Sequence, residues 1–245
     1  MQKGFHEPGE KPRRFYKTVE VAPVAEPAGF TVLLDGRNLR TPRGARLILS
    51  TRALADQVAA EWAAQGETID MAAMHANRLA NTALDAVPQA RDATAASVAA
   101  YAGSDLLCYF ADEPEGLIRR QAEAWEPVLA RAEAEAGLDF VRAAGIVHRP
   151  QPPQTLERVR ALAAGLDDFA LAGFAFGASL FGSAVLSLAL LRGWIDGPRA
   201  FELSRIDEAW QEEKWGVAAE AAERTARLRG EASMLDRWFR ALAAA

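Results

Sequence analysis

The feature that most constrains the fold is a run of 23 residues without a charged side chain, from Phe169 to Leu191. A run of this length is long enough to cross a membrane as a single helix. Glycine and serine residues divide it, however, and the segment 177–182 would interrupt one continuous helix. The sequence therefore favours two shorter helices that are buried as a hairpin. A membrane span over 169–191 stays open as the alternative.

The first part of the chain has the alternating pattern of β-strands rather than a helical pattern. The segment 15–21 is rich in β-branched and aromatic residues, and the segment 30–34 leads into Asp35-Gly36, the two-residue turn typical of a hairpin. Short strands over 37–41 and 46–49 complete a predicted antiparallel meander. A sheet of this size must bury its apolar face against another element.

A helix that covers this sheet is predicted directly after it, over residues 52–65. Either Ser50 or Thr51 can cap its N-terminus. Its apolar residues recur at intervals of four, so they share one face that packs on the sheet: Leu54, Val58 and Trp62.

The remainder of the chain is predicted to be mostly helical. Capping residues and periodicity indicate helices near 74–86, 88–102, 115–137, 155–166, 180–192, 197–229 and 233–243. The fold class is therefore α+β, with a small antiparallel β-rich N-terminal domain followed by a larger all-helical C-terminal domain. We place a flexible arm at 1–14, the β-rich domain with its covering helix at 15–72, and the helical domain at 73–245.

Composition excludes several classes of protein. Half of the residues are hydrophobic and a quarter are charged, as in ordinary globular proteins. The net charge of −5 provides no global positive field for nucleic acid. The single cysteine, Cys108, excludes an internal disulfide, and residues 1–14 resemble neither a secretory signal nor a transit peptide. We therefore expect a cytoplasmic monomer with no nucleic-acid partner and no stable membrane insertion.

Motifs for catalysis, phosphate binding or metal binding are not found in the sequence. The two glycine-rich motifs that bind phosphate groups, G-x-x-x-x-G-K-[ST] and G-x-G-x-x-G, do not occur. No serine lies in G-x-S-x-G, and the three histidines lie far apart in the sequence. No metal or cofactor is expected. An enzyme stays open as an alternative, with a polar pocket assembled from scattered residues such as His75, Asn77, Arg78 and Asp85.

The predicted helix over 197–229 carries the most informative surface. At 100° per residue, one apolar stripe should face the core: Leu203, Ile206, Trp210, Val217, Ala221 and Leu228. Trp215 falls on the opposite side, near three polar residues: Glu208, Gln211 and Glu212. Either another element covers this tryptophan, for instance the C-terminal helix, or the tryptophan binds a partner. Tryptophan is frequent at binding hot spots, and a nearby carboxylate selects basic groups.

The same region resembles a known family. Residues 204–216 (SRIDEAWQEEKWG) are similar to the signature of the assembly chaperones of the F1 sector of ATP synthase that handle the alpha subunit. Further matches occur in the same order along the chain, so that the resemblance extends from about Arg13 to Glu223. They comprise Arg14–Lys17, Leu34–Arg37, Glu61-Trp62 with Gln65, Asn77–Asp85 and Gly182-Ser183.

The resemblance implies an ATP-independent chaperone, and not an enzyme, that binds the unassembled F1 alpha subunit and keeps it competent for hexamer assembly. It implies that an acidic residue of the signature matters for activity; by position this is Glu208, with Asp207 as the neighbouring alternative. We therefore expect a partner-binding surface with Trp215 as apolar anchor and Glu208 as charge selector. Gln211 and Glu212 would lie at its rim.

Overall fold

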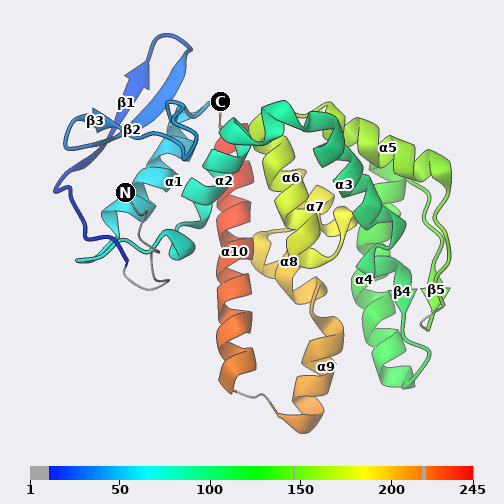
Figure 1. The fold of residues 1–245 in the computed structure, drawn as a ribbon. Coiled ribbons are helices and arrows are strands. Elements are labelled where there is room, and N and C mark those ends of the chain that lie inside the picture. The colour runs from blue at the N-terminus through cyan, green and yellow to red at the C-terminus, as the bar shows by residue number, and fades with distance from the viewer. Residues whose placement is uncertain (1–10, 146, 217–218, 245) are drawn as a thin grey trace, which may run out of the picture.

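A computed structural model describes residues 11–145, 147–216 and 219–244, so most of the predicted arm at 1–14 lies outside the described residues. A three-stranded antiparallel sheet lies near the N-terminus, in the order β1 (Val19–Val24), β2 (Gly29–Leu34) and β3 (Arg37–Asn38). Most of the remaining chain is helical (Figure 1). The predicted α+β fold class is confirmed, whereas the division into domains at residue 72 stays a prediction.

Most of the chain after the sheet consists of α-helices that follow one another in sequence. The α-helices are α1 (Arg52–Ala63), α2 (His75–Asp85), α3 (Arg91–Gly103), α4 (Glu115–Ala136), α5 (Pro153–Ala164), α6 (Asp168–Phe181), α7 (Ala184–Leu191), α8 (Gly197–Leu203), α9 (Ile206–Trp215) and α10 (Ala219–Ala243). Short elements complete the fold: η1 (Met71–Ala73), η2 (Val87–Gln89), η3 (Leu106–Cys108), and the parallel strands β4 (Tyr109–Phe110) and β5 (Ala143–Ala144).

The predicted hairpin turn is present between β2 and β3. Asp35 and Gly36 both have positive φ, 49° and 75°, as a two-residue turn of this kind requires. The prediction of strands at 15–21 and 46–49 was wrong in part. The first strand begins at Val19, because Tyr16 turns into the core instead, and the later segment forms only isolated bridges, such as Phe30 with Leu49.

Helix α1 covers the sheet as predicted and also packs against helices α2 and α10. Thr51 caps it by accepting a hydrogen bond from the backbone of Leu54 at 3.1 Å. Trp62 accepts a hydrogen bond from the Tyr16 hydroxyl through its carbonyl oxygen at 2.7 Å. The indole of Trp62 in turn donates to Asn77 of α2 at 3.0 Å. The end of α1 therefore joins the sheet to α2.

The charge-free run forms two buried helices, α6 and α7, as the glycine and serine positions predicted. Gly182 ends α6 with a left-handed φ of 64°, and Ser183 caps α7 by accepting from the backbone of Leu186. The predicted helix 180–192 was therefore wrong at its start, because α6 already occupies Asp168–Phe181. In the part of the chain that the structure describes, no helix has the length and apolarity to cross a membrane.

The single helix predicted over 197–229 was wrong, because it is broken twice. Helix α8 ends at Leu203, whose carbonyl oxygen accepts a hydrogen bond from the buried indole of Trp125 at 2.9 Å. Helix α9 ends at Trp215, and Gly216 follows it with a φ of 81°. The predicted separate helix 233–243 is the second half of α10. The predicted apolar stripe is confirmed only in part. Leu203 and Ile206 are buried, and Leu228 packs against the core. Ala221 is exposed, and Val217 lies outside the described residues.

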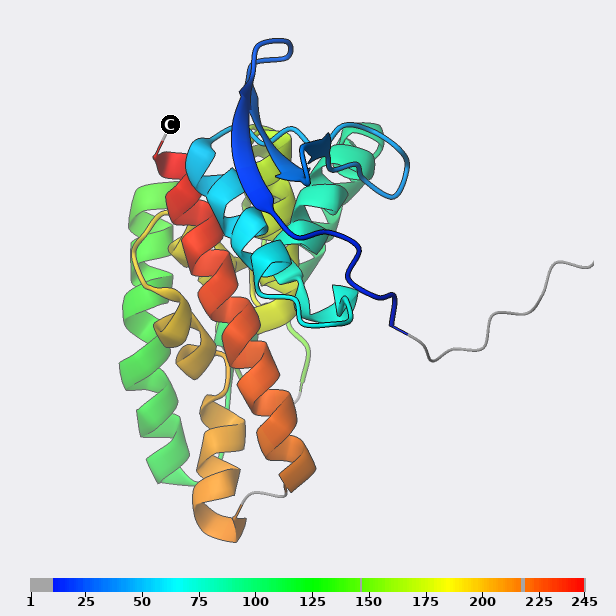
Figure 2. The ribbon, with the colours of Figure 1, turned by 90° about the vertical axis from the view of Figure 1, so that its left-hand side faces the viewer.

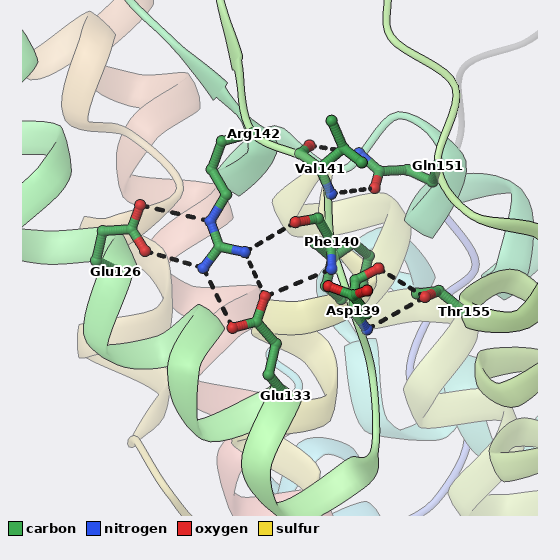
Figure 3. A network of polar contacts seen from close by, with 8 residues as sticks. All are labelled: Glu126, Glu133, Asp139, Phe140, Val141, Arg142, Gln151 and Thr155. Atoms are coloured by element: carbon green, nitrogen blue, oxygen red, sulfur yellow. Dashed lines mark hydrogen bonds and ion pairs between the residues drawn. The ribbon is translucent and has the colours of Figure 1, made fainter.

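Side chains hold the segment 139–144, which contains β5, from two sides (Figure 3). On one side, Arg142 of this segment forms ion pairs with Glu126 and Glu133 of α4. On the other side, Gln151 and Thr155, before and in α5, each exchange two hydrogen bonds with the backbone of the segment. These contacts place β5 beside β4, directly after which Ala111 donates to Gln121 of α4.

A buried carboxylate joins η3 to the start of α7. Asp105 is fully buried and accepts hydrogen bonds from the Ser183 hydroxyl at 2.6 Å and from the backbone of Leu107 and Val185 at 3.1 and 3.0 Å. Burial nevertheless raises the pKa of Asp105 to about 6. The folded state therefore holds a proton on this group at pH values where the unfolded chain has released it.

We predict that Asp105 makes the free energy of unfolding fall as pH rises from about 4 to about 6, because the native state binds more protons than the unfolded state in this window. In Asp105→Asn this component of the pH dependence should vanish. The difference in unfolding free energy between the unchanged chain and Asp105→Asn should therefore change by up to roughly 3 kcal/mol between about pH 4 and about pH 6. Denaturant titrations of both proteins at several pH values measure this difference. The same pH dependence in both proteins would contradict the prediction.

Candidate partner-binding cleft

Helix α9 and the first turns of α10 lie at the end of the molecule opposite the sheet (Figures 1 and 2). A cleft of about 1000 Å³ separates them. Four of the five residues predicted for the partner-binding surface line this cleft: Glu208, Gln211, Glu212 and Trp215. The structure therefore brings these residues together, although the single helix on which they were predicted does not exist.

One face of α9 forms a wall of the cleft. Residues three, four and seven positions apart lie on the same side of a helix, so Glu208, Glu212 and Trp215 share a face. Helix α10 forms the opposite wall with residues of both charges, among them Glu220, Arg224 and Arg227. The cleft is therefore polar on both walls and carries an aromatic side chain at one end.

Trp215 is exposed over 78% of its surface, and the C-terminal part of α10 does not cover it. The apolar residues of that part of the helix lie in the core instead, among them Leu235, Trp238 and Phe239. Because Gly216 ends α9 directly after Trp215, the indole lies on the last turn of the helix. An exposed indole at the edge of a cleft is a typical anchor for another polypeptide.

Glu208 and Glu212 are paired within the chain. Both accept from Arg205, which precedes α9: Nη1 lies 3.3 Å from Oε1 of Glu208 and Nη2 lies 3.3 Å from Oε1 of Glu212. The side chain of Glu208 is nevertheless 48% exposed. Arg205 also reaches across the cleft to Thr225 of α10. Arg205 was not among the residues predicted for this surface, although its position three residues before Glu208 was a usable signal.

Asp207 faces α4 rather than the cleft. Its carboxylate accepts a hydrogen bond from the side chain of Gln121 at 2.6 Å, and Gln121 is 1% exposed. The other amide atom of Gln121 accepts from the backbone of Ala111. The two neighbouring acids therefore have different environments. Asp207 holds α9 on α4, and Glu208 faces the cleft.

Two further contacts attach α9 to α4. The indole of Trp210 lies against Gly116, where an added Cβ would lie 2.7 Å from a ring carbon of the tryptophan. Lys214 covers the same indole, with Nζ 4.6 Å from the ring centroid. Arg120 forms an ion pair with Glu213 at 2.7 Å. Helix α9 is therefore fixed on α4, while its other face stays open to the cleft.

The residues named for an enzymatic pocket do not form one shared site. His75 and Arg78 line a mostly apolar hollow of about 290 Å³ between α2, α3 and α6. Asn77 instead accepts from Trp62, and Asp85 accepts from the Thr41 hydroxyl at 2.7 Å. Within the described residues, no group of three or more His, Cys, Asp or Glu side chains is arranged to hold a metal ion.

Comparisons with known proteins agree with this fold. The model of the ATP12 chaperone protein family matches residues 13–133. The protein atp12, mitochondrial, of Schizosaccharomyces pombe is 25% identical over 223 residues, which cover 86% of this chain and 76% of that protein. The family that this model describes is a class of chaperone proteins.

Solved structures extend the match beyond residue 133. The crystal structure of Atp12 from Paracoccus denitrificans is 41% identical, with a TM-score of 0.85, and covers 94% of this chain and 97% of that one. An aspartate-to-lysine mutant of the same bacterial protein has the same identity and coverage, with a TM-score of 0.84. The chain belongs to the ATP12 family. This membership supports a role as an assembly chaperone of ATP synthase.

We predict that Gly116→Ala destabilises the protein by about 1–3 kcal/mol, because the added methyl group overlaps the indole of Trp210 and overpacks the contact between α4 and α9. The matched control is Gly230→Ala in α10, where an added Cβ would meet no atom within 4 Å. It should stabilise the helix by about 0.5–1 kcal/mol. Denaturant unfolding compares the two, and equal effects would contradict the proposed contact.

Proposed function

We propose that this chain is an ATP-independent chaperone that binds the unassembled F1 alpha subunit of ATP synthase in the cleft between α9 and α10. The observation that carries the proposal is the exposed indole of Trp215 beside the half-exposed carboxylate of Glu208. Membership of the ATP12 family supports the assembly role. The resemblance of residues 204–216 to the signature supports the choice of client.

The chemistry of the cleft suits a transient protein partner. A subunit that waits for assembly exposes an apolar interface that would otherwise aggregate. An aromatic anchor contributes much of the binding energy of a small interface, and nearby charges select the partner. A cleft that is already formed needs no nucleotide to bind its client. We therefore place Trp215 as anchor, Glu208 as charge selector, and Gln211 and Glu212 at the rim, in a cytoplasmic protein that acts as a monomer.

The charge-selecting role predicts that Glu208→Lys lowers the affinity for the alpha subunit at least about tenfold, because repulsion replaces attraction to a basic group. The fold should persist, since Glu208 is half exposed. Glu157→Lys is the matched control, because Glu157 is an exposed glutamate on α5. Co-purification with tagged alpha subunit, together with a circular dichroism spectrum, tests the proposal. Equal capture by both variants would remove Glu208 from the binding surface.

The anchoring role predicts that a substitution of Trp215 weakens binding of the alpha subunit but leaves the stability of the fold nearly unchanged. Trp215→Ala should change the free energy of unfolding by no more than about 0.5 kcal/mol, because the side chain is 78% exposed. The same variant should bind the alpha subunit about 30-fold more weakly, as expected for a hot-spot tryptophan. Denaturant unfolding and titration of the alpha subunit measure the two effects. A large loss of stability with intact binding would instead make Trp215 a structural residue.

A further inference from the structure

Arg205 spans the cleft between α9 and α10. Its guanidinium group lies 3.3 Å from carboxylate oxygens of Glu208 and Glu212 on α9, and 3.3 Å from the hydroxyl of Thr225 on α10. The side chain of Arg205 is 22% exposed, which is less than either glutamate. The two carboxylates of α9 that face the cleft are therefore paired with a cation from the same chain.

The same arginine divides the space between the helices. One hollow, of about 1000 Å³, extends toward Trp215, and a second, of about 410 Å³, extends toward Phe201. The two hollows share three lining residues: Arg205, Glu212 and Thr225. If Arg205 moved aside, they would join into one groove. The second hollow is also lined by Glu123, an acceptor for the displaced guanidinium group, and by Glu202, which pairs with Arg199 at 3.3 Å.

We propose that Arg205 occupies, in the free chain, the position that a basic side chain of the client takes in the complex. The inference rests on the proposed function, because it assigns the client to the same cleft. A lysine or arginine of the alpha subunit would pair with Glu208 and Glu212 while Arg205 turns toward the second hollow. Arg205 is then an autoinhibitory contact, and the client must compete with it.

The exchange explains how the cleft can be specific without binding tightly. One ion pair is broken within the chaperone for each one that forms with the client, so the net gain is small. A neutral side chain cannot displace the guanidinium group from two carboxylates, so basic residues are favoured. A chaperone that must hand over its client needs this combination of selection and modest affinity.

Arg205 is not required to hold α9 in place. The contacts of Asp207, Trp210 and Glu213 with α4 attach this helix from its other side. A variant of Arg205 should therefore keep the fold and alter mainly the cleft. This separation makes the proposal testable by substitution.

The test compares Arg205→Gln, Arg205→Lys and the unchanged chain in titrations with purified F1 alpha subunit at several salt concentrations. Arg205→Gln should bind about twofold to fivefold more tightly, because the client no longer displaces an internal cation. Its dissociation constant should also rise more steeply with salt, since binding now creates a net ion pair. Arg205→Lys, which keeps the charge, should stay close to the unchanged chain.

Two further variants keep the test decisive. Arg52→Gln removes an exposed arginine that pairs with Asp56 on α1, and it should leave affinity and salt dependence unchanged. Thr225→Val removes only the contact of Arg205 with α10, and it should tighten binding less than Arg205→Gln does. If Arg205→Gln does not fold, Thr225→Val carries the test, and unchanged affinity in that variant overturns the proposal.

The outcomes separate this inference from the proposed function. Weaker or unchanged binding by folded Arg205→Gln, while Glu208→Lys still loses the client, overturns the competition and leaves the binding surface intact. Capture that survives in Glu208→Lys removes the binding surface, and the competition is overturned with it. Tighter binding with a steeper salt dependence supports both.

Discussion

The hydrogen bond from Trp62 to Asn77 fixes how the sheet and the helical part meet, and the rest of the structure is built on this joint. Beside it, the carboxylate of Glu61 accepts from the backbone of Ala76 and Asn77, both at 2.8 Å. The first turn of a helix has amide donors without helical acceptors. Burial raises the pKa of Glu61, yet two amide donors compensate its charge. Two consecutive residues of α1 thus orient the start of α2.

Two groups of the residues that carry the family resemblance lie at opposite ends of the molecule. One group builds the joint: Arg14 lies over the ring of Tyr16, and Tyr16 donates to the carbonyl oxygen of Trp62. The other group, residues 204–216, forms α9 and the wall of the cleft at the opposite end of the molecule. Helix α10 connects the two ends, because its C-terminal half packs beside α1, where Thr51 donates to the carbonyl oxygen of Ala241. The same helix therefore packs against α1 at one end and lines the cleft at the other.

Local rules predicted the parts of the fold that local chemistry decides. The Asp35-Gly36 turn, the start of α1 and the break at Gly182 follow from residues at those positions. The end of α8 could not be predicted in this way. It depends on the indole of Trp125, which is 78 residues earlier in the chain and donates to the carbonyl oxygen of Leu203. A single helical wheel drawn through the break at Leu203 and the second break at Gly216 does not describe α10, where Ala221 of the predicted apolar stripe is exposed. Ile206, directly after the first break, is buried as predicted.

In the candidate site, too, the sequence cannot decide which of two neighbouring acids faces the cleft. Asp207 and Glu208 are neighbours, and successive side chains on a helix point about 100° apart. They therefore cannot both point directly at the supporting helix. Which acid does so depends on Gln121, a residue of α4 that the sequence places 86 positions away from Asp207. The resemblance alone left both acids open. Because Gln121 binds Asp207, Glu208 is the acid whose charge a partner in the cleft can reach.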